Sequence, residues 1–588
     1  MDIEYNYDYL IVGAGVSGLY TAYNLCKKYP TAKICILEAT NYIGGRLHSI
    51  KYDGLIMDGG GARFNTEQHR IISLIKELDL WDKIIPISSD STYKPDYDKL
   101  SKTSLHNLTS LEHIFPTIDD FIIFMKKYIK EKKIKRSILI NTTIVEFAEE
   151  HFNKEYPNIK EYLINIYPYY SELVILNAVE SINLFSNELA KKTKYFILNG
   201  GMEQIADTLY NKLLEMKKNK KCNIDIYKET SIIKISDNIT IKKNNQIGYI
   251  IKTTNNNNNN NNTNNEKDKD FMVNKLILTI PKNKLLNIKF TIMNENKLKE
   301  LFKNINSIQN EPLYRIYARY PLDKKTHKVW FDGIGKIVTN LPIKYIIPIN
   351  YEKGVIMISY TDSKFAKYWV KQLADGKFED TLNKQLKQLF PDIDIPKAKW
   401  FKHCPWISGA GYWKKGSDRK IIMPKMIEAL GSHRNLYICG ENYSSHQAWV
   451  EGSLETSDMV LDKIYKYDHL AKQVYKRNKK TNKKYNNRTK GGSRKSYTKK
   501  IVKKNNSDLK IVKSFSLEEV AKHNTKSDAW IVINGKVADI TKWIPKHPGG
   551  DIIMKGVGKD ATSLFNSIGH DEYAKNMFKK YQIGILKK

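Results

Sequence analysis

Three glycines and an acidic residue near the N-terminus have the spacing of a nucleotide-binding turn. Gly13, Gly15 and Gly18 follow the apolar run at 9–12, and Glu38 ends a second apolar run. The first glycine permits a tight turn, the second lets the backbone approach a pyrophosphate, and the third lets helix pack on strand. The helix would point its free N–H groups at the pyrophosphate, while Glu38 would accept hydrogen bonds from a ribose diol. This order of strand, glycine turn, helix, strand and acid predicts dinucleotide binding.

Two further segments identify the dinucleotide. Gly45 and Arg46 follow the acidic residue, and residues 57–64 read MDGGGARF. Both resemble segments of the flavin-containing amine oxidase superfamily, where the arginine lies along the FAD pyrophosphate and the second segment lies near the flavin. The resemblance implies that FAD is the cofactor and that Gly61 and Ala62 contact it.

The cofactor pattern returns twice later in the chain. The strand-like residues 230–235 include Ile232, which matches the family position whose backbone contacts adenine. The strand-like residues 436–439 lead into Gly440 and Glu441, a match to the last FAD-binding motif of the superfamily. The helix that follows would point its positive N-terminal end at the electron-rich pyrimidine end of the flavin.

These returns imply a cofactor domain built from separated segments, with a substrate domain between them. The predicted fold class is α/β, with a Rossmann-type FAD-binding domain interleaved with a mixed-sheet plus helical substrate domain. The asparagine tract at 255–262 cannot bury apolar area, so we expect a disordered hairpin tip there. We expect FAD-binding segments at 1–70, 196–289 and 401–465, a helical insertion at 71–195, and a substrate-domain sheet at 290–400.

Two aromatic residues fall where many superfamily members place rings on either side of the reacting amine. Tyr412 ends the run GAGY, and Trp449 precedes VEG. The resemblance implies that these two rings form a cage beside the flavin, although a buried aromatic residue is otherwise ordinary core. Gly411 stands where covalently flavinylated monoamine oxidases carry a cysteine, so non-covalent FAD is implied.

Two arginines bear on the substrate and on the electron acceptor. Arg63 matches the arginine that pairs with the substrate carboxylate in L-amino-acid oxidases, a contact that suits a planar guanidinium. A structural or phosphate-binding role is the alternative, and the tyrosine that assists in those oxidases would fall near Ile347. Arg315 stands where many members carry a lysine that holds a water at flavin N5. Arginine is a poor proton acceptor, so reactivity with oxygen is in doubt.

A second, smaller domain is expected at 509–588, because this stretch resembles cytochrome b5. His547 lies in the sequence HPGG, and His570 follows it by 23 residues. The resemblance implies that these two imidazoles bind the iron of a b-type haem from opposite sides. The apolar residues expected to line the haem pocket are Ile552, Leu564 and Phe565.

The net charge of +34 is unevenly spread. Residues 471–506 hold fifteen lysines and arginines and no acidic residue. Runs of like charge are usually disordered, so we expect a basic linker at 466–508. The alternative is that this segment tethers a redox module to nucleic acid or to an acidic surface.

The cysteines and the N-terminus bear on location. The five cysteines are scattered and form no C-x-x-C pair, which argues against a disulfide framework or a zinc site and for a reducing compartment. The chain starts with no secretory signal and contains no apolar run of the ~20 residues that a membrane span needs. We therefore expect a soluble, cytoplasmic protein with no membrane anchor.

Together these features predict an oxidoreductase that transfers a hydride from an amine or an L-amino acid to FAD. Electrons would then pass to oxygen, to the fused haem, or to both. A polyamine oxidase or a flavin desaturase on the same scaffold is the competing enzyme prediction.

Overall fold

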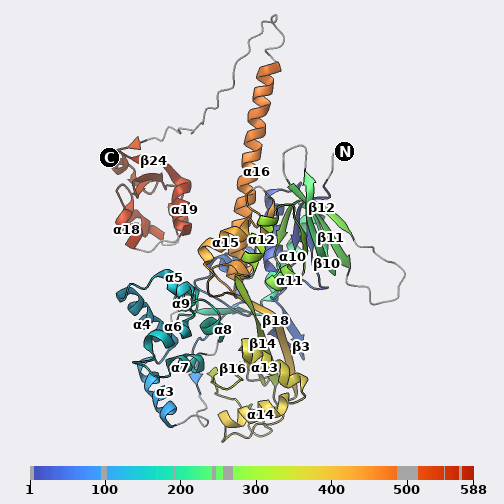
Figure 1. Cartoon of the computed structure of the whole chain (residues 1–588), viewed down its shortest axis with the longest axis vertical. Helices are drawn as coiled ribbons and strands as arrows, with labels where there is room; N and C mark the ends of the chain where they lie inside the picture. Colours follow the sequence, from blue (N-terminus) through green and yellow to red (C-terminus); the bar gives the residue numbers. More distant parts are fainter. Residues whose placement is uncertain are drawn as a thin grey trace, which may run out of the picture. The chain divides into compact units, whose positions relative to one another are not determined.

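The structure is a computed structural model (Figure 1) that describes residues 5–94, 102–167, 170–190, 193–240, 247–255, 269–432, 434–486, 514–547, 550–567 and 572–587. The chain divides into two compact units, Met1–Lys484 and Tyr485–Lys588. Of the asparagine tract, only the first residue lies within the described ranges, at the end of a strand.

An eight-stranded sheet forms the expected nucleotide-binding part of the first unit. Its order is β13-β10-β11-β12-β1-β2-β9, with β19 paired to β12. The pairs β12–β1, β1–β2, β2–β9 and β12–β19 are parallel, as in a Rossmann-type sheet. The bounds are β1 Tyr7–Val12, β2 Lys33–Leu37, β9 Asn223–Tyr227, β10 Thr230–Thr240, β11 Ile247–Asn255, β12 Asp270–Leu278, β13 Lys289–Thr291 and β19 Leu436–Ile438.

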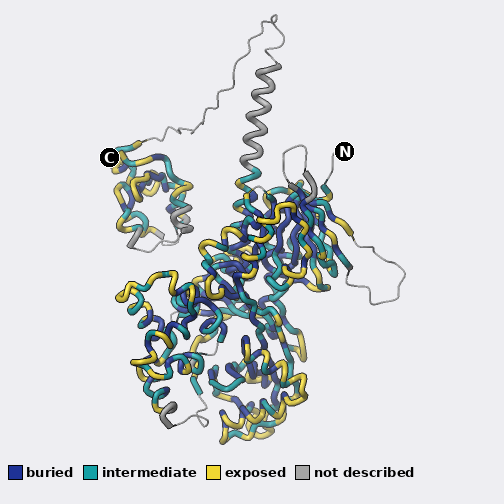
Figure 2. The backbone as a smooth tube through the Cα atoms, viewed as in Figure 1, coloured by how far each residue is buried: buried dark blue, intermediate teal, exposed yellow. Residues whose placement is uncertain are grey.

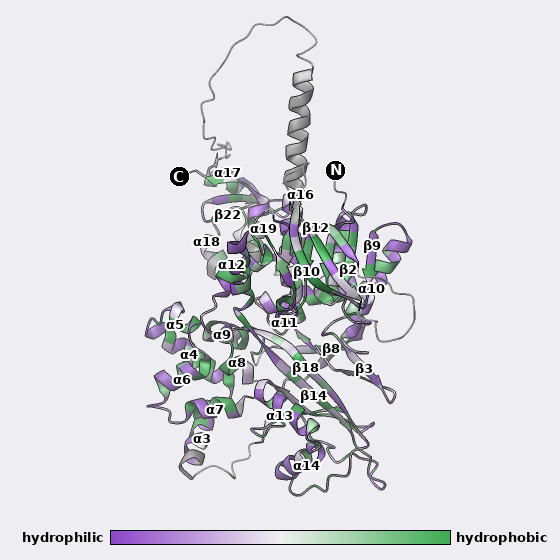
Figure 3. Cartoon of the chain, turned by 45° about the vertical axis from the view of Figure 1, so that its right-hand side comes forward, coloured by the Kyte–Doolittle hydropathy of each residue, from purple (hydrophilic) through white to green (hydrophobic). Residues whose placement is uncertain are grey.

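The apolar strands of this sheet are buried between layers, as expected of parallel strands. Figure 3 shows the strands as mostly hydrophobic, and Figure 2 shows dark blue, buried backbone through the sheet. Helices α1 (Val16–Lys28) and α10 (Glu203–Lys218) contribute side chains to one of the two cores that flank the sheet. The α/β prediction is confirmed.

A six-stranded sheet, in the order β18-β14-β17-β16-β15-β7, forms the centre of the substrate part. Helices α13 (Ser363–Ala374) and α14 (Phe378–Leu389) bury their apolar faces in the core of this sheet. The bounds are β7 Thr92–Tyr93, β14 Ile308–Arg319, β15 Ile337–Val338, β16 Tyr345–Asn350, β17 Val355–Asp362 and β18 Trp400–Trp413.

A helical insertion lies in the chain between β7 and the other strands of that sheet, and it has a core of its own. Two of its helices begin with capping boxes, in which Thr117 pairs with Asp120 and Thr143 pairs with Glu146. The bounds are α3 Lys102–Ile114, α4 Ile118–Glu131, α5 Arg136–Ile140, α6 Ile144–Phe152, α7 Ile159–Ile166, α8 Tyr170–Val174 and α9 Ala178–Asn187.

Short elements connect these parts. They are β3 Ser49–Tyr52, β4 Leu55–Asp58, β5 Phe64–Asn65, α2 His69–Glu77, η1 Trp81–Lys83, β6 Ile84–Ile87, β8 Tyr195–Leu198, α11 Lys282–Leu286, α12 Glu295–Ile305, α15 Arg419–Ile427 and η2 Glu441–Tyr443.

Helix α16 (Val450–Asn486) is longer than the sequence suggested. We expected the basic linker to begin at 466, but the helix continues to Asn486 because lysine is a good helix former and no proline or glycine interrupts the run. The rest of the predicted linker, from 487 onward, lies outside the described residues. Among the helices of the described part of the chain, none is long and apolar enough to cross a bilayer.

The second unit contains a five-stranded sheet in the order β20-β24-β23-β22-β21. Helices and sheet share a small apolar core. The bounds are β20 Ser514–Phe515, α17 Leu517–Lys522, β21 Asn524–Thr525, β22 Asp528–Ile533, β23 Lys536–Asp539, η3 Ile544–Lys546, η4 Gly550–Gly556, α18 Thr562–Ser567, α19 Glu572–Tyr581 and β24 Gln582–Leu586.

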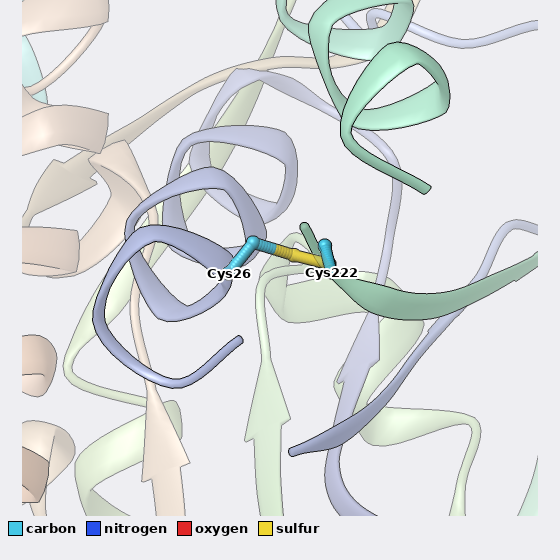
Figure 4. Close-up of a disulfide and its surroundings, with 2 residues drawn as sticks. All are labelled: Cys26 and Cys222. Carbon is cyan, nitrogen blue, oxygen red and sulfur yellow. A yellow bond between two sulfur atoms is a disulfide. The ribbon is translucent and has the colours of Figure 1, made fainter. Parts of the chain in front are cut away.

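The first unit contains a disulfide, which contradicts the expectation drawn from the scattered cysteines. Cys26, near the end of α1, is bonded to Cys222, just before β9, and their Cα atoms lie 5.2 Å apart (Figure 4). The two residues are separated by 196 positions in the chain, so only the packing of α1 beside β9 brings them together. The other three cysteines, Cys35, Cys404 and Cys439, are buried thiols.

Candidate active site

The turn between β1 and α1 has the close contacts that the glycine spacing predicted. Gly13 adopts a φ of +104°, and a Cβ atom on Gly18 would lie 1.9 Å from the carbonyl oxygen of Gly13. Helix α1 can therefore pack on β1 only through glycine. A Cβ atom on Gly15 would meet nothing nearer than 3.9 Å, and α1 begins there without a side-chain cap. The helix thus has an open, uncapped N-terminus able to receive an anion.

Glu38 closes this turn from the end of β2. Its two carboxylate oxygens accept hydrogen bonds from the backbone N–H of Ala14 (2.8 Å) and of Thr40 (2.9 Å). The carboxylate is thereby fixed at the mouth of the glycine turn. Ile232, the predicted adenine neighbour, lies on β10, where it pairs with Thr253 of β11.

An ion pair joins the first and last predicted cofactor segments. The Arg46 guanidinium donates to Glu441 Oε1 and to the carbonyl oxygen of Gly409 (3.0 Å). Glu441 is buried, and its second oxygen accepts the N–H of Ala448 (2.9 Å). Because Gly440 precedes Glu441 directly, this pair fixes the start of the last motif against the Gly45-Arg46 turn.

Residues 59–62 pack on that same turn. The N–H of Gly61 donates to the carbonyl oxygen of Arg46 (2.8 Å), and a Cβ atom on Gly60 would lie 1.9 Å from that oxygen. Gly61 and the adjacent Ala62 therefore sit beside Arg46, so the structure brings the predicted cofactor residues of these three segments together.

Arg63, Tyr195 and Trp449 stack beside these segments. The Tyr195 and Trp449 rings lie 6.4 Å apart and nearly parallel. The Arg63 guanidinium carbon lies 4.7 Å from the Tyr195 ring centre and 5.6 Å from that of Trp449, within reach of cation–π attraction. The charge of Arg63 also lowers the pKa of Lys336, although burial is the larger cause and the two together bring that pKa to about 8. Two cationic groups therefore lie close together on this side of the site.

Tyr412, the other predicted cage residue, contacts an acid that the sequence did not single out. Its hydroxyl donates to Glu172 Oε1 on α8 (3.1 Å), and both side chains are buried. A second carboxylate, Asp362 at the end of β17, accepts the backbone N–H of Tyr170 (3.1 Å) and of Ser171 (2.7 Å). Burial, followed by the charge of Asp362, raises the pKa of Glu172 well above that of an ordinary glutamate.

A buried lysine faces the second carboxylate. Lys344 is 1% exposed, and its ammonium has no hydrogen-bond partner within the described part of the chain. Burial lowers its pKa to about 7, against the opposing effect of Asp362. The region beside Tyr412 thus combines two carboxylates with a lysine that loses its charge easily.

Arg315 lies on β14, close to the end of β4. It donates to the carbonyl oxygen of Asp58 (2.7 Å), and its guanidinium carbon lies 4.7 Å from the Tyr360 ring centre. Tyr317 donates to the same carbonyl oxygen (2.8 Å). Asp58 is the second residue of the segment 57–64 that was predicted to lie near the flavin, so Arg315 anchors the start of that segment.

In the second unit, His547 directly follows η3 and precedes η4. Ile552 and Leu564 are large apolar side chains that stay 48% and 37% exposed, while Phe565 packs on the small core. The exposure of Ile552 and Leu564 is consistent with a role in lining a pocket for a flat apolar group. His570 lies outside the described residues, so its predicted role as the second iron ligand stays a prediction.

Comparison with known families decides the family. Residues 16–459 match the flavin containing amine oxidoreductase family. The chain belongs to that family. Residues 516–587 match the cytochrome b5-like heme/steroid binding domain. The cofactors are accordingly FAD for the amine oxidoreductase part and haem for the b5-like part.

The similar proteins fall into two groups. The C-terminal part is 52% identical over 75 residues to cytochrome b5 of Rhizopus stolonifer and 51% identical to that of Borago officinalis. Those residues are 13% of this chain and 57% of each relative, so the chain spans a little over half the length of these curated proteins. An uncharacterized protein of Acanthamoeba polyphaga mimivirus is 24% identical over 507 residues, which cover 78% of this chain and 94% of the relative.

Solved structures show the fold of the larger part. A putrescine oxidase with redesigned cofactor binding matches 78% of this chain and 99% of its own, with a TM-score of 0.55 and 14% identity. A triple mutant of the same enzyme matches with a TM-score of 0.54 and 13% identity. The described architecture is therefore that of a flavin amine oxidase fold.

The geometry of this amine oxidoreductase fits FAD. The open space at Gly15 and the uncapped start of α1 would hold the pyrophosphate, and Glu38 at the end of β2 would hold the ribose. Gly45, Arg46, Gly61 and Glu441 converge on one place, as a shared ligand requires.

Sequence reasoning did not identify Glu172, Asp362, Lys344 or Tyr195 as site residues. Glu172 and Asp362 lie 190 positions apart, and neither belongs to a motif. One signal was present: Glu172 is the only charged residue in a long apolar and aromatic stretch of the sequence, 162–178. A charge that must be buried with its helix indicates function or a specific partner.

Proposed function

We propose that this chain oxidises a cationic amine with FAD and passes the electrons to its own haem. The observation that supports this most is the hydrogen bond from Tyr412 to the buried Glu172, with Asp362 beside it. Two carboxylates beside a predicted cage ring favour a positively charged substrate over one that carries only an anion.

Bound FAD would supply the acceptor for the hydride that leaves the carbon next to the amine nitrogen. The protein residues would orient that carbon and exclude water. Tyr412 and Trp449 would hold the amine from two sides, because both rings are fixed: Tyr412 by Glu172, and Trp449 by its stack on Tyr195. Arg46 and Glu441 would hold the cofactor between the first and last segments.

A second candidate is an L-amino acid. It is favoured by Arg63 and Lys336, which lie close enough for each charge to affect the other and could receive a carboxylate. A basic amino acid would use both sides of the site, with its carboxylate on the cations and an ammonium on the acids.

The haem is proposed as acceptor because of Arg315. The residue at this position is engaged with the carbonyl oxygen of Asp58 and is an arginine, which cannot exchange protons with a bound water. Because the b5-like domain is covalently linked, it would offer the reduced flavin a one-electron acceptor at high effective concentration.

Anaerobic absorption spectroscopy tests the proposal. The holoenzyme is titrated with putrescine, with benzylamine and with L-leucine, and both the flavin and the haem bands are followed. Bleaching of the flavin by an amine, followed by haem reduction, is expected. His547→Ala should lose the haem bands and stop at reduced flavin. If L-leucine alone bleaches the flavin, the amino-acid candidate replaces the amine, and if nothing bleaches it, the proposed function fails.

A further inference from the structure

The helical insertion places one carboxylate oxygen at the site without a partner. Glu172 Oε1 accepts the hydroxyl of Tyr412, but Glu172 Oε2 is buried and has no hydrogen-bond partner among the described residues. A buried carboxylate oxygen with no donor is costly, and a donor supplied by a bound ligand is one way in which that cost is removed. The residue comes from α8, an element to which no cofactor role was assigned.

The groups around Glu172 make it a stronger base. Asp362 on β17 adds a second negative charge, which raises the pKa of Glu172. The backbone N–H of Glu172 itself, the Tyr412 hydroxyl and the charge of Arg63 only partly offset this rise. Asp362 cannot turn away, because the first two residues of α8 donate their backbone N–H groups to it. Two lysines also lie in this region: the charge of Asp362 acts on Lys344, and Lys364 lies over the Tyr170 ring of α8. Burial is the largest effect, and it raises the pKa of the Glu172 carboxyl group.

The proposed reaction needs such a base. An alkyl amine resembles lysine, whose pKa is about 10.4, so it reaches the enzyme as an ammonium ion at neutral pH. An ammonium has no lone pair to assist loss of hydrogen from the adjacent carbon. An ordinary glutamate, with a pKa of about 4.3, is some six units too weak to take the proton. A carboxylate whose basicity is raised by burial narrows that gap.

We propose that Glu172 is the base that accepts the proton of the substrate ammonium, an inference that rests on the proposed amine oxidation. The N–H bond of the ammonium breaks, its electron pair stays on nitrogen, and an O–H bond forms at Glu172 Oε2. The products are a neutral amine and a neutral carboxylic acid, so no unpaired charge is left in the buried site. Nothing is oxidised in this step, and the proton leaves to solvent after the product does.

The first test is the pH dependence of flavin reduction in wild type and Glu172→Gln. Glutamine keeps the shape and still accepts the Tyr412 hydrogen bond, but it cannot take a proton. The rate is measured with an amine that bleaches the flavin and with its β-fluorinated analogue, whose ammonium is more acidic. In wild type, the fall in rate at low pH should have the same midpoint for both amines. In Glu172→Gln it should shift to follow the pKa of each amine, with at least a tenfold loss of rate at neutral pH.

Either of two results overturns the inference. In the first, the acidic side of the wild-type rate–pH profile shifts with the pKa of the amine. In the second, Glu172→Gln has the same profile as wild type. Asp237→Asn is the matched control, because Asp237 is also buried with one unpartnered oxygen but lies on β10, away from Tyr412. Its profile should equal that of wild type.

Calorimetry supplies a readout that needs no turnover. Tert-butylammonium carries no hydrogen on the carbon next to nitrogen, so it can bind but cannot be oxidised. The raised pKa of Glu172, about 8, leaves its carboxyl group mostly protonated in the free enzyme at pH 7, and it must lose that proton before it accepts the one from the ammonium. Titration at pH 7 in two buffers of different ionisation enthalpy should therefore show release of about one proton per site in wild type and in Asp237→Asn. Glu172→Gln should release none. Equal release in all three proteins refutes the role of Glu172, whereas failure of every amine to bleach the flavin refutes the proposed function instead.

Discussion

Loss of the Cys26–Cys222 disulfide should destabilise the first unit strongly. The disulfide closes a loop of 196 residues. In the chain-entropy treatment, freeing a loop of this length in the unfolded state costs about 5 kcal/mol of stability at 25 °C. The perturbation is Cys222→Ala, which removes the bond at the end next to β9.

The expected change in midpoint follows from the size of the unit. With an unfolding entropy of about 2.1 cal/mol/K per residue, the unit Met1–Lys484 has a total of about 1 kcal/mol/K. A loss of about 5 kcal/mol therefore lowers the thermal midpoint by about 5 °C. Scanning calorimetry of oxidised wild type, reduced wild type and Cys222→Ala measures this shift, and the latter two should agree.

Cys35→Ala is the matched control, because Cys35 is a buried thiol in the neighbouring strand β2. It loses only packing, at a cost of about 1 kcal/mol. Denatured wild type should titrate three thiols before reduction and five after it. Five thiols before reduction, or the same midpoint for Cys222→Ala as for Cys35→Ala, would refute the reasoning.

Three further predictions concern the glycine turn, the partly buried His446 and the haem. Gly18→Ala should abolish FAD binding, because the new methyl group would overlap the Gly13 carbonyl oxygen. The loss would be seen as disappearance of the absorption band of oxidised flavin at about 450 nm. Burial would lower the pKa of His446, but its hydrogen bond to Glu455 and nearby acids raise it to about 8. This stabilisation, about 2 kcal/mol, is complete below pH ~6.5 and is lost as the pH rises through ~8; denaturant titrations at both pH values should show it in wild type and not in His446→Gln. His547→Ala should lose the haem band and keep its FAD content; retained haem would contradict its predicted role as an iron ligand.

The cofactor segments could be predicted because their requirements are local. Gly13, Gly18 and Gly45 are dictated by the backbone within a few residues, through a positive φ or a close approach to a neighbouring carbonyl group. A spacing pattern records such constraints directly.

The acidic side of the site could not be predicted in this way. Glu172 meets Tyr412 across 240 positions, and Asp362 meets Ser171 across 191. These contacts depend on how the helical insertion packs on the six-stranded sheet, which no local pattern specifies. The disulfide escaped prediction for the same reason, since the spacing of its cysteines carries no motif. The length of α16 was underestimated because charge was weighed above helix propensity.

The predicted cofactor residues and the acidic residues beside Tyr412 come from different parts of the first unit, which explains why the substrate is harder to identify than the cofactor. The cofactor contacts come from segments whose backbones are fixed by glycine and by the Arg46–Glu441 pair. The acidic group comes from α8, whose first two backbone N–H groups donate to Asp362 of the sheet. A change in the insertion can therefore alter the charge beside Tyr412 without disturbing the flavin site. On the proposed function, substrate choice and cofactor binding are therefore separable in this fold, with Glu172 in the part that selects the substrate.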